Sequence, residues 1–215
     1  MASSQVSAVL LPKGSFHKMP WKNGQGLTSE IAIYPEDAKV SENSFLWRLS
    51  SAELAQGGSF SSFPGYERYF TLVKGGGLQL EFESNKRQVL LEQGQVCQFS
   101  GKEVVSSLLS GGAVQDLNLI YSSSRVKAVF ESIALNAKPR SFGMIGTVGF
   151  LYCVDGAVSA QVFPGEMKFR IPEGDVLRLD LARAPSTGQE GLIWVEPAVL
   201  GATCHVILIE LTVQF

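Results

Sequence analysis

The sequence predicts an all-β protein, and three observations support this fold class. The chain holds 22 glycines and 9 prolines in 215 residues, which is typical of frequent turns. Its apolar residues fall in short runs that alternate with polar ones, the period of a half-buried strand. A strand–glycine–strand pattern also occurs twice. We therefore expect a β protein with, at most, a turn or two of helix near residues 51–54.

The expected strands are the short runs that combine alternation with β-branched or aromatic residues. In the first half these are residues 45–50, 69–73, 78–82, 88–91, 95–99 and 114–120. In the second half they are residues 150–154, 158–163, 167–171, 175–181, 192–195 and 204–213.

An internal repeat organises these strands. The turn at Gly75 is followed by a hairpin and then by Gly94, 19 positions later, and the turn at Gly156 is followed by a hairpin and then by Gly174, 18 positions later. The units recur about 80 residues apart, as in a duplicated jelly roll. We expect two barrels, one over residues 1–125 that carries the ligand pocket, and a degenerate one over 126–215.

Composition and charge exclude several classes of partner. The 23.2 kDa chain is 45% hydrophobic and 18% charged, with a formal net charge of −2 and no basic stripe, so we expect no nucleic-acid partner. The N-terminal apolar run is too short for a signal or a membrane span. Cys97, Cys153 and Cys204 are odd in number and far apart, which favours buried thiols in a reducing compartment. We expect a cytoplasmic protein, and the sequence leaves a homodimer open.

The run from Phe60 to Gly77 resembles the first metal-binding motif of cupins with its ligands replaced. That motif has two histidines one residue apart, then a glutamate, six residues and a glycine. Here Arg68 stands in the glutamate position before Gly75, and the histidine positions fall on Ser62 and Pro64. The third histidine position falls near Val104. Guanidinium has no lone pair for a metal, so we expect no metal and no cofactor, but an anion pocket.

Four stretches of the first 120 residues are also distinctive, namely WKNGQGLTSE (21–30), FLWRLS (45–50), FSSFPGYER (60–68) and the Asp116-x-Asn118 step. Together they resemble one family, the HutD/Ves-type proteins. The resemblance implies an RmlC-like two-cupin (bicupin) fold and a link to bacterial histidine utilisation. There, HutD-type proteins restrain the pathway by binding a small intermediate such as urocanate. The motifs do not separate the HutD branch from the Ves branch.

Arg48 and Arg68 are the expected anchors of an anion. Alternation places Arg48 on one strand face with Ser50, where a charge is costly unless it is paired or faces a pocket. The alternative for Arg48 is an ion pair with Glu53 or Asp116. The motif position points Arg68 into the barrel, and the alternative is an edge arginine stacked on its neighbour Tyr66.

Asp116 and Asn118 alternate together on their strand. Asp116 could accept a proton from an imidazole N–H, and Asn118 could bridge to a carboxylate. Asp116 could equally hold Arg48 or Arg68 in place, and the two roles are compatible.

A glycine-rich segment and an aromatic run complete the expected pocket. Trp21, Asn23 and Thr28 belong to a segment that could close over the barrel mouth, with Gly24 and Gly26 permitting positive φ; the alternative is a plain turn with Trp21 in the core. Phe60, Ser61 and Phe63 could supply apolar walls and a hydroxyl, although phenylalanines at this spacing are more often core residues.

These residues favour a non-catalytic protein that binds a small carboxylate, urocanate or a formylglutamate-like intermediate, and modulates histidine utilisation. The alternative is a metal-independent isomerase or epimerase, with His17, Glu67 or Asp116 as its base. No recognisable acid–base dyad supports that alternative, and we assign no catalytic residue. His205 is expected to be a satisfied core histidine. A purely structural or partner-binding role is a third reading.

Overall fold

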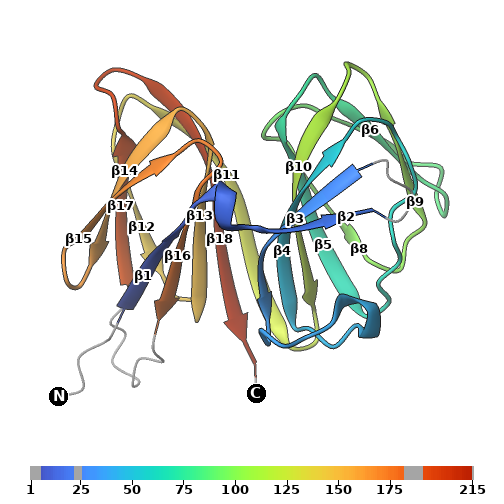
Figure 1. Ribbon diagram of the computed structural model, residues 1–215, viewed down its shortest axis with the longest axis horizontal. Helices are drawn as coiled ribbons and strands as arrows, with labels where there is room; N and C mark the ends of the chain where they lie inside the picture. Colours follow the sequence, from blue (N-terminus) through green and yellow to red (C-terminus); the bar gives the residue numbers. More distant parts are fainter. Residues whose placement is uncertain (1–5, 22–25, 182–190, 215) are drawn as a thin grey trace. The chain divides into compact units, whose positions relative to one another are not determined.

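The computed structural model describes residues 6–21, 26–181 and 191–214, and it confirms the all-β prediction (Figure 1). The strands are β1 (Val6–Leu11), β2 (His17–Pro20), β3 (Gly26–Tyr34), β4 (Trp47–Leu54), β5 (Tyr66–Lys74), β6 (Leu78–Phe82), β7 (Gln88–Leu91), β8 (Val96–Ser100), β9 (Val105–Leu109), β10 (Val114–Ser122), β11 (Val126–Asn136), β12 (Arg140–Met144), β13 (Val148–Asp155), β14 (Ala157–Phe163), β15 (Met167–Pro172), β16 (Val176–Leu181), β17 (Gly191–Pro197) and β18 (Thr203–Val213). Two 3-10 turns, η1 (Lys13–Ser15) and η2 (Val40–Glu42), also occur.

The chain forms two compact units. One comprises Phe16–Val126, and the other comprises Met1–Ser15 together with Lys127–Phe215. The expected division assigned residues 1–15 to the N-terminal part, but β1 pairs antiparallel with β16 over six residue pairs. Val6, Ala8 and Leu10 pack against the apolar core of the C-terminal unit, and this burial explains where β1 lies.

Both units use the same strand pairing, so the sequence repeat corresponds to a repeated arrangement of strands. In the N-terminal unit β5 pairs with β8 and β10, while β6 pairs with β7 and β9. In the C-terminal unit β13 pairs with β16 and β18, while β14 pairs with β15 and β17. The four repeat glycines, Gly75, Gly94, Gly156 and Gly174, all have positive φ, a backbone conformation that side chains disfavour.

The N-terminal unit consists of a six-stranded sheet, β2-β3-β4-β10-β5-β8, and a three-stranded sheet, β7-β6-β9. An apolar cluster drawn from both sheets forms its core and includes Phe70, Leu72, Leu80 and Phe99. Alternation along β4, β5 and β10 directs one face of the larger sheet toward this core and toward a cavity beside it.

Several expectations need correction at the level of elements. Residues 51–54 extend β4 and form no helix. The strands β1, β2, β3, β9, β11 and β12 were not expected. β2, with the sequence HKMP, shows why, because it has little alternation and depends on its pairing with β3.

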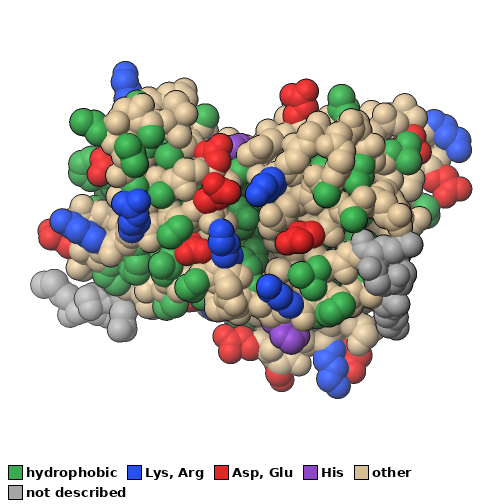
Figure 2. All heavy atoms as spheres, turned by 45° about the horizontal axis from the view of Figure 1, so that its top comes forward, with side chains coloured by type: hydrophobic (Ala, Val, Ile, Leu, Met, Phe, Trp, Pro, Cys, Tyr) green, Lys and Arg blue, Asp and Glu red, His purple; other side chains and the backbone are tan. Residues whose placement is uncertain are grey.

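The surface charges, the cysteines and the hydrophobicity of the helices can be compared with the expectations from composition. On the face drawn in Figure 2, acidic and basic side chains are interspersed, and no basic stripe gathers among the described residues. Cys97, Cys153 and Cys204 are buried free thiols, as expected. In the described part of the chain, no helix combines the length and the hydrophobicity that crossing a membrane requires.

Candidate functional site

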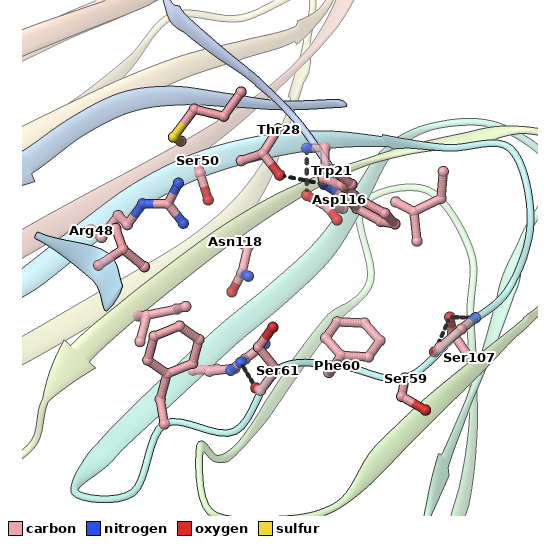
Figure 3. A pocket seen from close by; sticks show the side chains of 18 of the residues that line it. Trp21, Thr28, Arg48, Ser50, Ser59, Phe60, Ser61, Ser107, Asp116 and Asn118 are labelled. Carbon is pink, nitrogen blue, oxygen red and sulfur yellow. Dashed lines mark hydrogen bonds between the residues drawn. The ribbon is translucent and has the colours of Figure 1, made fainter. Parts of the chain in front are cut away.

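A cavity of about 580 Å³ lies in the N-terminal unit, and it gathers the residues that the sequence singled out. Of the expected ligand-binding residues, ten line it: Trp21, Thr28, Arg48, Ser50, Phe60, Ser61, Phe63, Arg68, Asp116 and Asn118. Asn23 lies outside the described residues. Figure 3 shows Arg48, Ser50 and Asn118 directed into one space, with Phe60 and Ser61 across from them.

Strand register explains why the polar side chains converge. Arg48 on β4 pairs with Ile120 on β10, and Ile120 pairs with Arg68 on β5. The two arginines therefore stand two strands apart, about 10 Å between their Cα atoms, on one face of the sheet. In the next row, Ser50 pairs with Asn118, and both side chains line the cavity beside the arginine row.

Arg68 is a buried cation surrounded by aromatic rings. Its side chain is only 3% exposed, and β5 lies between β10 and β8, so the edge-arginine alternative is wrong. Its guanidinium carbon lies 5.6 Å from the Phe60 ring centroid, 5.0 Å from that of Phe63 and 5.8 Å from that of Phe99. These cation–π contacts replace part of the lost hydration and hold the guanidinium in place.

The hydrogen bonds of Arg68 leave capacity for a ligand. Its Nη2 donates to the carbonyl of Ser61, while its buried Nε has no acceptor. Among the described residues, no carboxylate lies within ion-pair distance of Arg68. Burial lowers the pKa of Arg68 to about 10, with Asp116 opposing the shift and Arg48 adding to it, so the group is a cation at neutral pH.

Arg48 is in a different state because it has a counterion. Its Nε donates to Glu30 Oε2 at 2.5 Å, and both side chains are largely buried. The expected partners, Glu53 and Asp116, are not the ones it uses. Glu30 ends the WKNGQGLTSE stretch and lies two residues after Thr28 on β3, so alternation along β3 was the signal that could have identified it.

Asp116 lies at an irregularity in the pairing of β10 with β5. Its Oδ1 accepts a hydrogen bond from the backbone N–H of Ala52 at 2.9 Å, and its own carbonyl accepts one from Ser51 Oγ at 2.6 Å. The side chain is 4% exposed. Burial raises the pKa of Asp116 to about 7, although the Ala52 N–H, Arg68 and Arg48 all act to lower it.

Asn118 contributes an unused acceptor. Its Oδ1 is buried and has no hydrogen-bond partner. A buried polar atom without a partner is costly, and at a cavity wall a ligand can supply that partner. An N–H or O–H donor on a bound molecule would satisfy it.

Trp21 and Thr28 form part of the cavity wall. Trp21 Nε1 donates to Thr28 Oγ1 at 2.8 Å, and Thr28 belongs to β3 rather than to a loop. The expected role of Gly26 is corrected, because its φ is not positive. A Cβ at Gly26 would lie 2.7 Å from the Trp21 ring, so glycine is required there for close packing.

Of the four positions that correspond to the cupin metal ligands, only Arg68 lines the cavity. Ser62, Pro64 and Val104 do not line it, and Val104 is 61% exposed. Within the described residues, no group of three or more His, Cys, Asp or Glu side chains could hold a metal ion. His205 hydrogen-bonds through Nε2 to Ser132 Oγ at 2.6 Å in the other unit. His17 is exposed on β2.

Other proteins of known sequence resemble this chain, and one of them does so over nearly its whole length. An uncharacterized 21.2 kDa protein in the hutC 3′ region of Pseudomonas putida is 34% identical over 201 residues, covering 94% of this chain and 97% of the relative. Protein Ves of Citrobacter koseri is 37% identical over 145 residues, covering 65% of this chain and 71% of the relative.

Solved structures of other proteins also resemble this chain. HutD from Pseudomonas fluorescens SBW25 has a TM-score of 0.76 at 29% identity, and a conserved protein of unknown function from Pseudomonas aeruginosa PAO1 has 0.82 at 25%; each match covers 97% of this chain and 100% of the other. Oxalate decarboxylase has a TM-score of 0.63 at 9% identity, covers 100% of this chain and 79% of that one, and supports a cupin-like fold alone. The HutD family model matches residues 13–193, and the chain therefore belongs to the HutD family.

Proposed function

We propose that this protein binds a small carboxylate without turning it over, and that it modulates histidine utilisation through this binding. One observation carries the proposal, which is the state of Arg68. Arg68 lines the cavity, is 3% exposed, lacks a carboxylate partner among the described residues and keeps a buried Nε without an acceptor, and these features support an anion site. A carboxylate there would form charge-assisted hydrogen bonds, worth about 1.5–3 kcal/mol each.

The rest of the cavity favours a flat ligand with a hydrogen-bond donor. Phe60 and Phe63 offer apolar walls, and Asn118 Oδ1 needs a donor. Urocanate combines a carboxylate, a planar conjugated body and an imidazole N–H, so it matches all three features. A formylglutamate-like molecule matches the carboxylate but has no ring. We therefore rank urocanate first.

The family supports the link to histidine utilisation. One relative is named by its position in a hutC 3′ region, and the structure of a HutD protein was obtained in a formate condition. Formate is the smallest carboxylate and a suitable minimal probe of the site. In this proposal each unit is a cupin-type jelly-roll barrel, and only the N-terminal one serves the ligand.

Titration calorimetry with urocanate, N-formylglutamate and formate tests the proposal. Saturable binding of urocanate is expected, and Arg68→Ala should weaken it by well over tenfold, because among the described lining residues the anion loses the one cation without a carboxylate partner. Arg68→Lys should recover part of the loss, since a point charge lacks the two-pronged geometry. Arg87→Ala is the matched control, because Arg87 makes a cation–π contact with Phe82 at 3.9 Å outside the cavity. Equal losses in both alanine variants, or no binding at all, would refute the proposal.

A metal-independent enzyme is the second candidate, and Asp116 is the observation that favours it. A pKa of about 7 suits a general base at neutral pH, and the carboxyl lines the cavity. If the protein consumes a bound ligand catalytically and Asp116→Asn abolishes that turnover, this candidate replaces the binding function.

A further inference from the structure

The net charge of the cavity depends on a single proton. Among the described residues that line it, only Arg48, Arg68 and Asp116 carry ionisable charge, and Glu30 pairs with Arg48. With Asp116 ionised, two positive and two negative charges cancel. With Asp116 protonated, the cavity has one net positive charge to offer an anion.

The protonation state of Asp116 is the variable in this charge balance, because the charged groups near it are two arginines and a glutamate that is already paired. Arg48 faces it from β4, Arg68 from β5, and Glu30 stands on β3 already paired with Arg48. His17 on β2 lies opposite Glu30 in register but is exposed. Residues 55–63 carry no titratable side chain. Neither arginine comes within ion-pair distance of Asp116, so neither one fixes its charge by direct contact.

Geometry also orients the carboxyl toward a ligand. Oδ1 is held by the Ala52 N–H, and the second carboxyl oxygen has no partner among the described residues. In the protonated form that oxygen is a donor, whereas in the ionised form it repels a neighbouring anion. The raised pKa of Asp116, about 7, means that either form is accessible near neutral pH.

We propose that the cavity takes up one proton with each bound anion, that Asp116 carries this proton as a neutral carboxylic acid, and that the cavity consequently selects ligands with a single negative charge. This inference rests on the proposed function and specifies the ligand class. A dianion would leave an unbalanced buried charge even after Asp116 is protonated, which is costly. Above pH 7 the affinity for a monoanion should fall by about tenfold per pH unit, because the proton must be recovered from solvent.

Calorimetry in paired buffers measures the proton directly. Urocanate is titrated at pH 8.5 in two buffers of different ionisation enthalpy, above the range in which an imidazole takes a proton. We expect an uptake close to one proton per ligand. N-formylglutamate, a dianion, should bind at least tenfold more weakly than urocanate.

Two variants separate this role from a structural one. Asp116→Asn keeps an oxygen for the Ala52 N–H and is permanently neutral, so its proton uptake should vanish and its affinity should not change with pH. At pH 9 it should bind urocanate about tenfold or more tightly than the native protein, a gain that structural damage cannot produce. Glu53→Gln, at an exposed carboxyl on β4, should leave the uptake near one.

The outcomes distinguish the two proposals. Urocanate binding without proton uptake in the native protein overturns the proton-linked inference and leaves the proposed function standing. A lack of binding at every pH overturns both. If Asp116→Asn does not fold, the native measurement in paired buffers at pH 8.5 still decides the question.

Discussion

The two arginines of the cavity lie in one row of the sheet, on β4 and β5, but differ in electrostatic state. Arg48 is neutralised by Glu30 at 2.5 Å, whereas Arg68 has aromatic rings in place of a carboxylate. The pair on Arg48 keeps a charge buried at low cost and shapes the wall. In the proposed function, the charge of Arg68 is available to the ligand.

Removing the counterion of Arg48 should have two opposite effects. Glu30→Gln leaves a largely buried guanidinium unpaired, so the free energy of unfolding should fall by on the order of 2 kcal/mol. The same change adds a net positive charge to the cavity, so the affinity for a carboxylate should increase. Urea unfolding measures the change in stability, and calorimetry at the same pH measures the change in affinity. Glu42→Gln, in the exposed pair with Lys39, should change neither noticeably. A loss of affinity in Glu30→Gln would contradict this assignment of charges.

Asp116 should make stability depend on pH in the direction opposite to an ordinary ion-paired carboxylate. Its pKa rises from 3.8 to about 7 on folding, so the folded state holds the proton where the unfolded chain has released it. Relative to Asp116→Asn, the native protein should therefore lose stability as the pH rises from about 4 through 7, and stay level above that. Urea unfolding of both proteins at pH 5 and pH 8 measures the difference. If the free energies of unfolding of the native protein and Asp116→Asn differ by the same amount at pH 5 and pH 8, Asp116 does not titrate in this range.

At the scale of elements, the segment before β5 is fixed to the smaller sheet. Gly58 and Ser107 exchange backbone hydrogen bonds of 3.1 and 2.9 Å, and the Phe60 N–H donates to the Val105 carbonyl at 2.9 Å. This attachment to β9 sets the positions of Phe60 and Ser61, which contact Arg68. The orientation of Arg68, the proposed anion anchor, thus depends on a neighbouring strand.

Two adjacent glycines test this dependence. A Cβ at Gly57 would lie 2.1 Å from the Ser107 carbonyl oxygen, whereas at Gly58 nothing lies within 4 Å. Gly57→Ala should displace the segment, lower the unfolding temperature and weaken carboxylate binding, by about tenfold for a loss near 1.4 kcal/mol. Gly58→Ala should preserve binding. Equal effects from both substitutions would mean that the attachment to β9 does not position the site.

Much of the element pattern was readable from sequence, and the exceptions have physical reasons. Alternation in residues 78–82 and 88–91 predicts β6 and β7 with the bounds that the structure has. Alternation also brings Arg68 and Asn118 to the cavity. The Glu30–Arg48 pair depends on the register of β3 with β4, and the hydrogen bond from Ala52 to Asp116 depends on an irregular pairing that no local pattern encodes.

At the scale of the whole molecule, the two units share one strand-pairing scheme but differ at the position that Arg68 occupies in the N-terminal unit. Arg68 stands seven residues before Gly75, and the position seven residues before Gly156 is Gly149. A Cβ at Gly149 would lie 2.1 Å from the Met144 methyl group, so the described residues of the C-terminal unit fill this space with an apolar side chain. This difference supports our proposal that the carboxylate binds in the N-terminal unit.

A crystal structure of the protein with urocanate tests the central proposal most directly. We expect one ligand per chain, with its carboxylate about 2.8 Å from Arg68 Nε and its ring N–H directed at Asn118 Oδ1. Arg48 should remain paired with Glu30. A ligand bound elsewhere, or an Arg68 Nε still without an acceptor in a fully occupied complex, would contradict the account.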